Sequence, residues 1–153
     1  MQFDEFKEAV SGRWHGTNQL FMGPPPVAGI SSASQLRAAP AVGGCFLQFD
    51  YAWAYEGTEE TGLLLLGYDE ENAASAAWVD SFHMSSKIMF CTGTAADGVV
   101  TVLGTYSAPP EPDWGWRMAI QAVSARELQV LMHNITPAGE EALAVQMDYT
   151  RVG

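Results

Sequence analysis

The sequence predicts an all-β fold, a closed antiparallel β-barrel of about nine to ten strands with a short N-terminal helix. Three observations indicate this class. Short runs rich in β-branched and aromatic residues recur at nearly regular spacing, turn sequences separate them, and no long helical stretch lies between them. A parallel sheet would need such helices as crossovers. The 153 residues, 1–153, are predicted to form a single domain with its own core.

The start of the chain has the pattern of a short amphipathic helix. Phe3, Phe6 and Val10 recur at helical spacing, with charged residues between them. Ser11 and Gly12 then end the helix. We expect this helix to plug one end of the barrel.

Nine strands are predicted after the helix, each bounded by turn residues. They are Trp14–Met22, Cys45–Trp53, Gly62–Tyr68, Ala76–Phe82, Lys87–Thr92, Val99–Tyr106, Gly115–Val123, Glu127–Asn134 and Leu143–Arg151. In several of them an apolar set of residues alternates with a mixed set, so each set occupies one face of the sheet. Such alternation suits a barrel whose interior holds a few polar groups among apolar walls. It leaves open which face points inward.

The segment Gly23–Gly44 differs from the rest because it is rich in Pro, Ala, Ser and Gly. It predicts a long loop after the first strand, with a short helix or an extra strand near Ser34–Ala39. Long loops in compact domains are usually functional or disordered. Two roles for this segment stay possible: a lid over the barrel mouth, or an insertion that the fold tolerates.

The charge of the chain excludes two classes of partner. Eighteen acidic and seven basic residues give a net charge of −11, and the basic residues are scattered singly. Nucleic acid and anionic membrane surfaces need clustered Lys and Arg, so neither is an expected partner. The N-terminus lacks a signal-peptide pattern and no apolar run is long enough to span a membrane. We therefore expect a cytoplasmic protein in which Cys45 and Cys91 are reduced thiols.

Gly12 and Trp14 open the first predicted strand in a Gly-x-Trp pattern, and Arg151 ends the last one. These three residues resemble the closure device of lipocalins and related calycin barrels. In those barrels an Arg near the end of the chain covers the Trp by cation–π packing. The resemblance implies a structural role for Trp14 and Arg151.

Five further motifs follow one another along the chain, namely Gly43–Leu47, Leu66–Asp69, Trp78–Ser81, Trp116–Arg117 and Tyr149–Arg151. In this order they resemble a narrower bacterial family, catalogued as domain of unknown function 1579 and thought to be lipocalin-like. The resemblance runs from about Trp14 to Arg151, and the Pro-rich loop matches least. It implies a barrel, and it implies neither an activity nor catalytic residues.

A small, partly apolar ligand inside the barrel is the function that the residues favour. The predicted ligand-binding residues are Trp78, Asp80, Arg117, Gln121 and His133. Trp78, Asp80 and Phe82 share one strand face, so an inward Asp80 would need a counter-charge, and Arg117 is the natural partner. Such a pair would hold an anionic or polar head group of a ligand. The alternative is that Asp80 and Arg117 both lie on the surface and bind nothing inside the barrel.

Two alternative functions stay open at this point. A haem protein resembling the nitrobindin-like calycins would use His133 from the barrel wall as its iron ligand. A structural or interaction module would instead fill the barrel with its own aromatic and Met side chains. The sequence has no GxSxG, HExxH or phosphate-loop motif, so no catalytic residue, metal or cofactor is predicted. The partners expected are a small molecule and, as an open option, a second copy of the chain in a homodimer.

Overall fold

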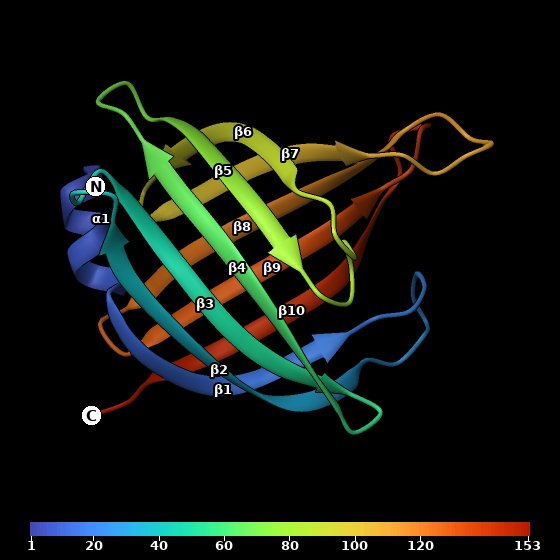
Figure 1. The fold of residues 1–153 in the computed structure, drawn as a ribbon, viewed down its shortest axis with the longest axis horizontal. Helices are drawn as coiled ribbons and strands as arrows, with labels where there is room; N and C mark the ends of the chain where they lie inside the picture. The colour runs from blue at the N-terminus through green and yellow to red at the C-terminus, as the bar shows by residue number, and fades with distance from the viewer.

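Ten antiparallel strands close into a barrel in the computed structural model, which describes residues 1–153 (Figure 1). The elements are α1 (Phe3–Val10), β1 (Gly12–Leu20), β2 (Ile30–Ala41), β3 (Phe46–Tyr55), β4 (Thr58–Tyr68), β5 (Ala73–Asp80), β6 (Met89–Ala96), β7 (Val99–Tyr106), β8 (Trp114–Ser124), β9 (Glu127–Ile135) and β10 (Glu141–Arg151). Each strand pairs with its neighbours in the chain, and β1 pairs with β10 to close the sheet. The prediction of an all-β closed barrel with one short helix is confirmed.

The tenth strand, β2, lies inside the segment that the sequence predicts as a long loop. Ile30–Ala41 pairs with both β1 and β3, so of the two options near Ser34–Ala39 the extra strand is confirmed, and it extends to residues that were predicted as loop. Ser34, Leu36 and Ala38 are buried while Gln35 and Arg37 between them are exposed, which is the alternation of a half-buried strand. Small and polar residues supply that alternation, and they lack the β-branched signal that marks the other strands.

The helix closes one end of the barrel. Phe6 and Val10 are fully buried, and Phe6 packs edge-on against Tyr68 with ring centroids 6.0 Å apart. The end lies on the left in Figure 1, beside the turns that follow β2 and β4. Burial of these apolar faces ties the short helix to the barrel, because an isolated helix of this length is not stable in water.

The predicted cation–π closure is present at the same end. The Arg151 guanidinium lies 4.3 Å from the ring centroid of Trp14. It also donates to the backbone oxygens of Ser11 and Ala125, at 2.8 Å each. The Trp14 indole donates to the carbonyl of Val10 at 2.9 Å. Arg151 therefore links the helix, the first strand and the last strand.

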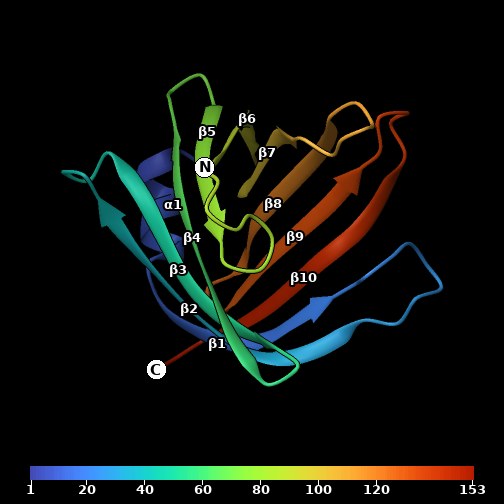
Figure 2. The ribbon, with the colours of Figure 1, turned by 45° about the vertical axis from the view of Figure 1, so that its right-hand side comes forward.

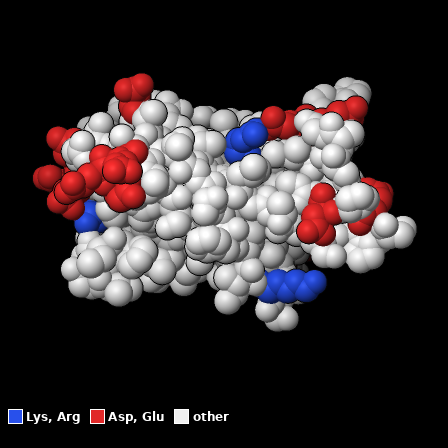
Figure 3. All heavy atoms as spheres, turned by 90° about the horizontal axis from the view of Figure 1, so that it is seen from above, with Lys and Arg blue, Asp and Glu red and all other residues white.

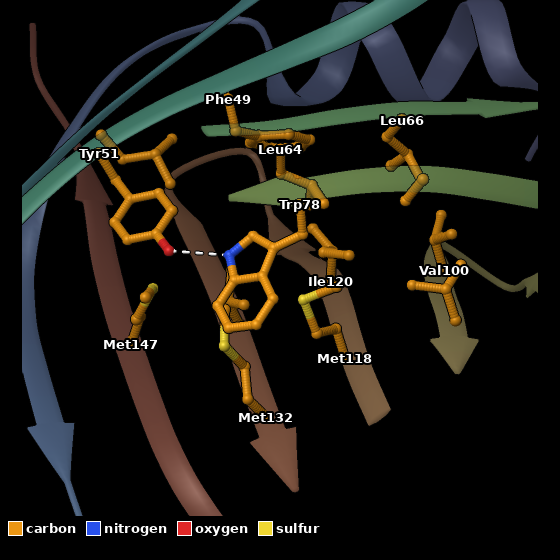
Figure 4. Close-up of a cluster of buried hydrophobic side chains, with 14 of the residues drawn as sticks. Phe49, Tyr51, Leu64, Leu66, Trp78, Val100, Met118, Ile120, Met132 and Met147 are labelled. Carbon is orange, nitrogen blue, oxygen red and sulfur yellow. Dashed lines mark hydrogen bonds between the residues drawn. The ribbon is translucent and has the colours of Figure 1, made fainter. Parts of the chain in front are cut away.

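One apolar core of 31 buried residues runs through the barrel, from Phe6 of the helix to Leu20 and Trp116 near the opposite end. Trp78 lies among side chains from other walls, including Tyr51 and the labelled methionines Met118, Met132 and Met147 (Figure 4). Acidic side chains gather towards the two ends of the molecule on the face seen in Figure 3. None of the helices meets the length and hydropathy needed for a membrane span.

Candidate functional site

The end of the barrel opposite the helix contains a pocket. Four connections meet there, at 21–29, 81–88, 107–113 and 136–140, together with the tight β3–β4 turn. Figure 2 shows the yellow-green β5–β6 connection curling across this opening. Between it and the ends of β8, β9, β10 and β1 lies a cavity of about 490 Å³, lined by Leu20, His83, Trp116, Asn134 and Ala144 among others. We call this cavity the mouth pocket.

Tryptophan rings from three walls meet one histidine at the mouth pocket. The His83 ring lies 5.9 Å from Trp53 of β3, 5.7 Å from Trp78 of β5 and 5.3 Å from Trp116 of β8, measured between centroids. Five steps separate β3 from β8 in either direction around the ten-stranded barrel, so they form opposite walls. Trp78 and Trp116 also stack on each other at 5.3 Å with 12° between their planes. His83 therefore lies across the width of the opening.

The connection that carries His83 is anchored by a buried carboxylate. Asp80, at the end of β5, is 3% exposed. Its Oδ1 accepts the backbone N–H groups of Phe82 at 2.8 Å and His83 at 3.0 Å. Its Oδ2 accepts the Tyr51 hydroxyl at 2.6 Å, and that hydroxyl accepts the Trp78 indole N–H at 3.0 Å. Hydrogen bonds to the charged form stabilise a carboxylate, so Asp80 needs no cation.

Burial sets the protonation of the groups around Asp80. The pKa of Tyr51 is raised well above its usual value, by burial first and by the neighbouring Asp80 charge second. The pKa of His83 is lowered, because burial outweighs the opposing effects of Asp80 and Glu60. His83 is therefore a neutral imidazole at neutral pH, which suits its place among tryptophan rings.

Four buried polar atoms in this half of the barrel have no hydrogen-bond partner. They are Nδ2 and Oδ1 of Asn18 and the Nε1 atoms of Trp53 and Trp116. Each of the three residues is at most 4% exposed. Trp116 lines the mouth pocket, Trp53 contacts His83, and Asn18 is the next inward position after Leu20 along β1. Because buried polar groups are nearly always paired, this region has unused hydrogen-bonding capacity.

The structure brings together only two of the five predicted site residues. Trp78 and Asp80 are buried and point inward. Arg117, Gln121 and His133 are on the outer face, because the buried residues of β8 and β9 are the alternate ones, Trp116, Met118, Ile120, Leu128, Val130 and Met132. Along a strand, alternate residues face opposite sides of the sheet. Because the buried set faces inward, Arg117, Gln121 and His133 face outward and do not line the interior.

The inward Asp80–Arg117 pair is consequently wrong. Arg117 forms its ion pair with Glu141, which is at the rim of the mouth pocket, and not with Asp80. His133 pairs with Arg117 across β8 and β9, and its pKa is lowered by partial burial and then by the Arg117 charge. A haem iron held inside the barrel by His133 is also wrong, since the imidazole is on the other face of the sheet.

Sequence reasoning missed His83, Trp53, Trp116 and Asn18 as site residues. Asn18 had a usable signal, because Trp14, Asn18 and Leu20 share one strand face and Asn18 is the polar member. Trp53 and Trp116 fall within predicted strands, and only their facing was undecided. His83 had no signal, since its position depends on the path of a connection without periodicity.

A larger groove of about 950 Å³ lies on the outer faces of β1 to β5. Arg13, His15, Arg37 and Asp50 line it, and all four are exposed. Their polar groups reach water, so the groove has none of the unmet hydrogen-bonding capacity of the mouth pocket. We therefore take the smaller mouth pocket as the candidate site.

The fold and this pocket define a class, a closed ten-stranded antiparallel barrel with an aromatic pocket at the end opposite its helix. The chain belongs to the family described as "Protein of unknown function (DUF1579)", whose model matches residues 5–151. The resemblance found in the sequence motifs is thus confirmed.

Among solved structures, the chain is similar to the crystal structure of Rv2717c from M. tuberculosis, with a TM-score of 0.61 and 13% sequence identity. The match covers 95% of this chain and 94% of that one, and at this identity it supports the fold alone. No curated protein matches the chain.

Proposed function

We propose that the protein binds a small, partly apolar molecule in the mouth pocket. The observation that carries the proposal is a cavity of about 490 Å³ whose lining includes Trp116, with a buried indole N–H that lacks a partner. Ligand sites combine apolar and aromatic walls with a few polar groups, and this cavity has Trp116, Phe82 and Leu20 beside Asn134 and His83. The helix end is closed by Phe6 and Val10, whereas the mouth pocket lies at the opposite end and has room for a ligand.

A titration with Nile red, a neutral dye whose emission depends on its surroundings, tests the proposal. We expect a saturable blue shift with one site per chain. Ala142→Trp should abolish it, because Ala142 lines the pocket opposite Asn134 and the added indole would occupy the cavity. Ala142 is only half-buried, so the substitution should be tolerated by the fold.

Gln121→Ala is the matched control, since Gln121 is on the outer face of β8 and should leave dye binding unchanged. Circular dichroism would verify that both variants keep the strand content of the wild type. Dye binding that survives Ala142→Trp, or that is absent from the folded wild type, would refute the proposal.

A self-filled structural module is the second candidate function. It is favoured by the single cluster of 31 buried apolar residues, which occupies most of the barrel interior. This candidate predicts that no small molecule binds at saturable stoichiometry. The Nile red titration therefore separates the two functions directly.

We also propose that the protein works in the cytoplasm. Cys45 and Cys91 are both free thiols, which suits a reducing compartment. Cell fractionation with an antibody against the chain would test this, and recovery outside the cytoplasmic fraction would contradict it.

A further inference from the structure

We infer that the mouth pocket selects uncharged ligands that present a hydrogen-bond acceptor, such as the carbonyl of an amide, ester or ketone. The inference rests on the proposed function and adds the chemical class of the ligand. Two independent features carry it, namely the kind of polar atom left unpaired and the sign of the charges around the opening.

Three of the four unpaired buried atoms are donors. They are the indole N–H groups of Trp53 and Trp116 and the amide nitrogen of Asn18. An indole nitrogen can donate and cannot accept, so only an acceptor can satisfy it. Trp53 and Trp116 approach His83 from opposite walls, at 5.9 and 5.3 Å between ring centroids, which places both beside the same opening. A carbonyl oxygen in the pocket would pair with the Trp116 indole N–H, which is in the pocket lining, and its second lone pair could accept from one further donor.

The fourth unpaired atom is the Oδ1 of Asn18, an acceptor. An amide ligand offers an N–H beside its carbonyl, so its groups match both atoms of the Asn18 side chain, the next inward residue after the lining residue Leu20. Buried polar groups without partners are costly, so a ligand that pairs with them is favoured.

The charges at this end of the barrel disfavour an anionic head group. Asp80 is the one buried residue that carries a charge, and it lies beside Tyr51 and Trp78 without a cation. Glu140 and Glu141 line the pocket, and Glu60 acts on His83 from β4. Of the basic residues nearby, Lys87 is exposed, and Arg117 is paired with Glu141 at the rim, which leaves Glu140 as the unpaired charge of the lining. An anion entering here would meet negative charge first and no buried cation.

An ammonium head group is disfavoured for a different reason. It brings only donors, and the unpaired atom in the pocket lining, the Trp116 indole N–H, is also a donor. The acidic rim attracts a cation to the opening, but three of the four unpaired buried atoms, all except Asn18 Oδ1, cannot accept its protons. An uncharged acceptor can pair with these donors and is not repelled by the acidic rim.

Competition against Nile red tests the inference with three ligands that share one alkyl chain: octanamide, octanoate and octylammonium. We expect octanamide to displace the dye at concentrations about tenfold or more below those of the two charged ligands. Trp116→Phe keeps an aromatic ring against Trp78 and removes one donor, so the preference for octanamide should shrink several-fold. Trp53→Phe provides the same test at the opposite wall, and Gln121→Ala should keep the wild-type preference.

Each outcome bears on a different statement. Octanoate or octylammonium binding as tightly as octanamide would overturn the inference while leaving the pocket as a ligand site. The same follows if none of the three displaces a dye that itself binds at the mouth pocket, or if both Trp→Phe variants keep the full preference. Failure of Nile red to bind the wild type would instead refute the proposed function.

Discussion

At the scale of single residues, Asp80 organises the open end of the barrel. Its two carboxylate oxygens accept hydrogen bonds from the Tyr51 hydroxyl and from the backbone of Phe82 and His83. The strand β5 ends at Asp80 and the chain turns there, so one side chain both satisfies a buried network and directs the connection across the opening. Arg117, the residue expected to neutralise it, lies on the other face of the sheet.

Asp80→Asn tests this role. The amide nitrogen of Asn cannot accept a hydrogen bond, so at least one of the three donors loses its partner. We predict a loss of about 1–3 kcal/mol in the free energy of unfolding, measured by urea denaturation. Asp50→Asn is the control, because Asp50 is exposed and bonds only to the side chain of Gln48. Equal stability of the two variants would contradict the role given to Asp80.

His83 should make the stability of the folded protein depend on pH. Burial lowers its pKa below the usual 6.5, so the folded protein resists a proton that the unfolded chain accepts. The resulting stabilisation is complete above 6.5 and is lost as the pH falls towards the lowered pKa. His83→Phe keeps an aromatic ring and removes the titration. We therefore predict that the variant loses less stability than the wild type between about pH 7.5 and pH 5.

Urea denaturation at both pH values provides the measurement. His133 titrates in both proteins, so the difference between wild type and variant isolates His83. Parallel pH dependence of the two proteins would show that the imidazole is not held neutral by the fold.

At the scale of elements, the pairing of β1 with β10 closes the barrel. Gly16 of β1 lies opposite Tyr149, and a Cβ atom at Gly16 would lie 1.8 Å from the backbone oxygen of Asp148. Backbone cannot rotate away as a flexible side chain does, so the strands would have to separate. The pairing of β1 with β10 thus requires glycine at position 16 because no side chain fits there, and not because of the backbone conformation.

Gly16→Ala should therefore destabilise the protein by about 3 kcal/mol or more, or prevent folding. Gly23→Ala serves as the matched substitution, because the nearest atom to its Cβ would be Val27 Cγ2 at an ordinary 3.6 Å. Thermal unfolding followed by circular dichroism would compare the two. A Gly16→Ala protein as stable as Gly23→Ala would contradict the close approach of β1 and β10.

The strands also differ in how well their local sequence pattern predicts them. Strands β8, β9 and β10 alternate apolar residues with mixed ones, and they form as predicted. The strand β2 was predicted only as one of two options near Ser34–Ala39, and too short, because Ser, Ala and Pro replace the β-branched residues that usually mark a strand. Its neighbours β1 and β3 determine it by pairing along both edges, and such pairing is not visible in a local pattern.

At the scale of the whole molecule, the two ends of the barrel differ in chemistry. The helix end is closed by apolar packing and by Arg151 over Trp14. The opposite end combines a cavity, three tryptophans, a neutral histidine and unpaired donors. Sequence alone predicted the barrel and its closed end, because these depend on repeating patterns and a motif.

The site was only partly predictable for the same reason. Trp78 and Asp80 were placed on one strand face and both lie inside, whereas Arg117, Gln121 and His133 belong to the outward set of their strands. A period of two assigns residues to faces and cannot say which face is inner when both are mixed. His83 reaches the interior through a connection, where no periodicity applies.

The most direct measurement of ligand binding at the mouth pocket is a ¹⁵N–¹H correlation spectrum of the five tryptophan indoles, recorded with and without Nile red. The indole resonances of Trp53 and Trp116 should shift on binding, while that of Trp14, which donates to Val10 at the closed end, should not. Single Trp→Phe variants assign the peaks. Shifts confined to Trp14, or no indole shift at saturating dye, would contradict a binding site at the open end of the barrel.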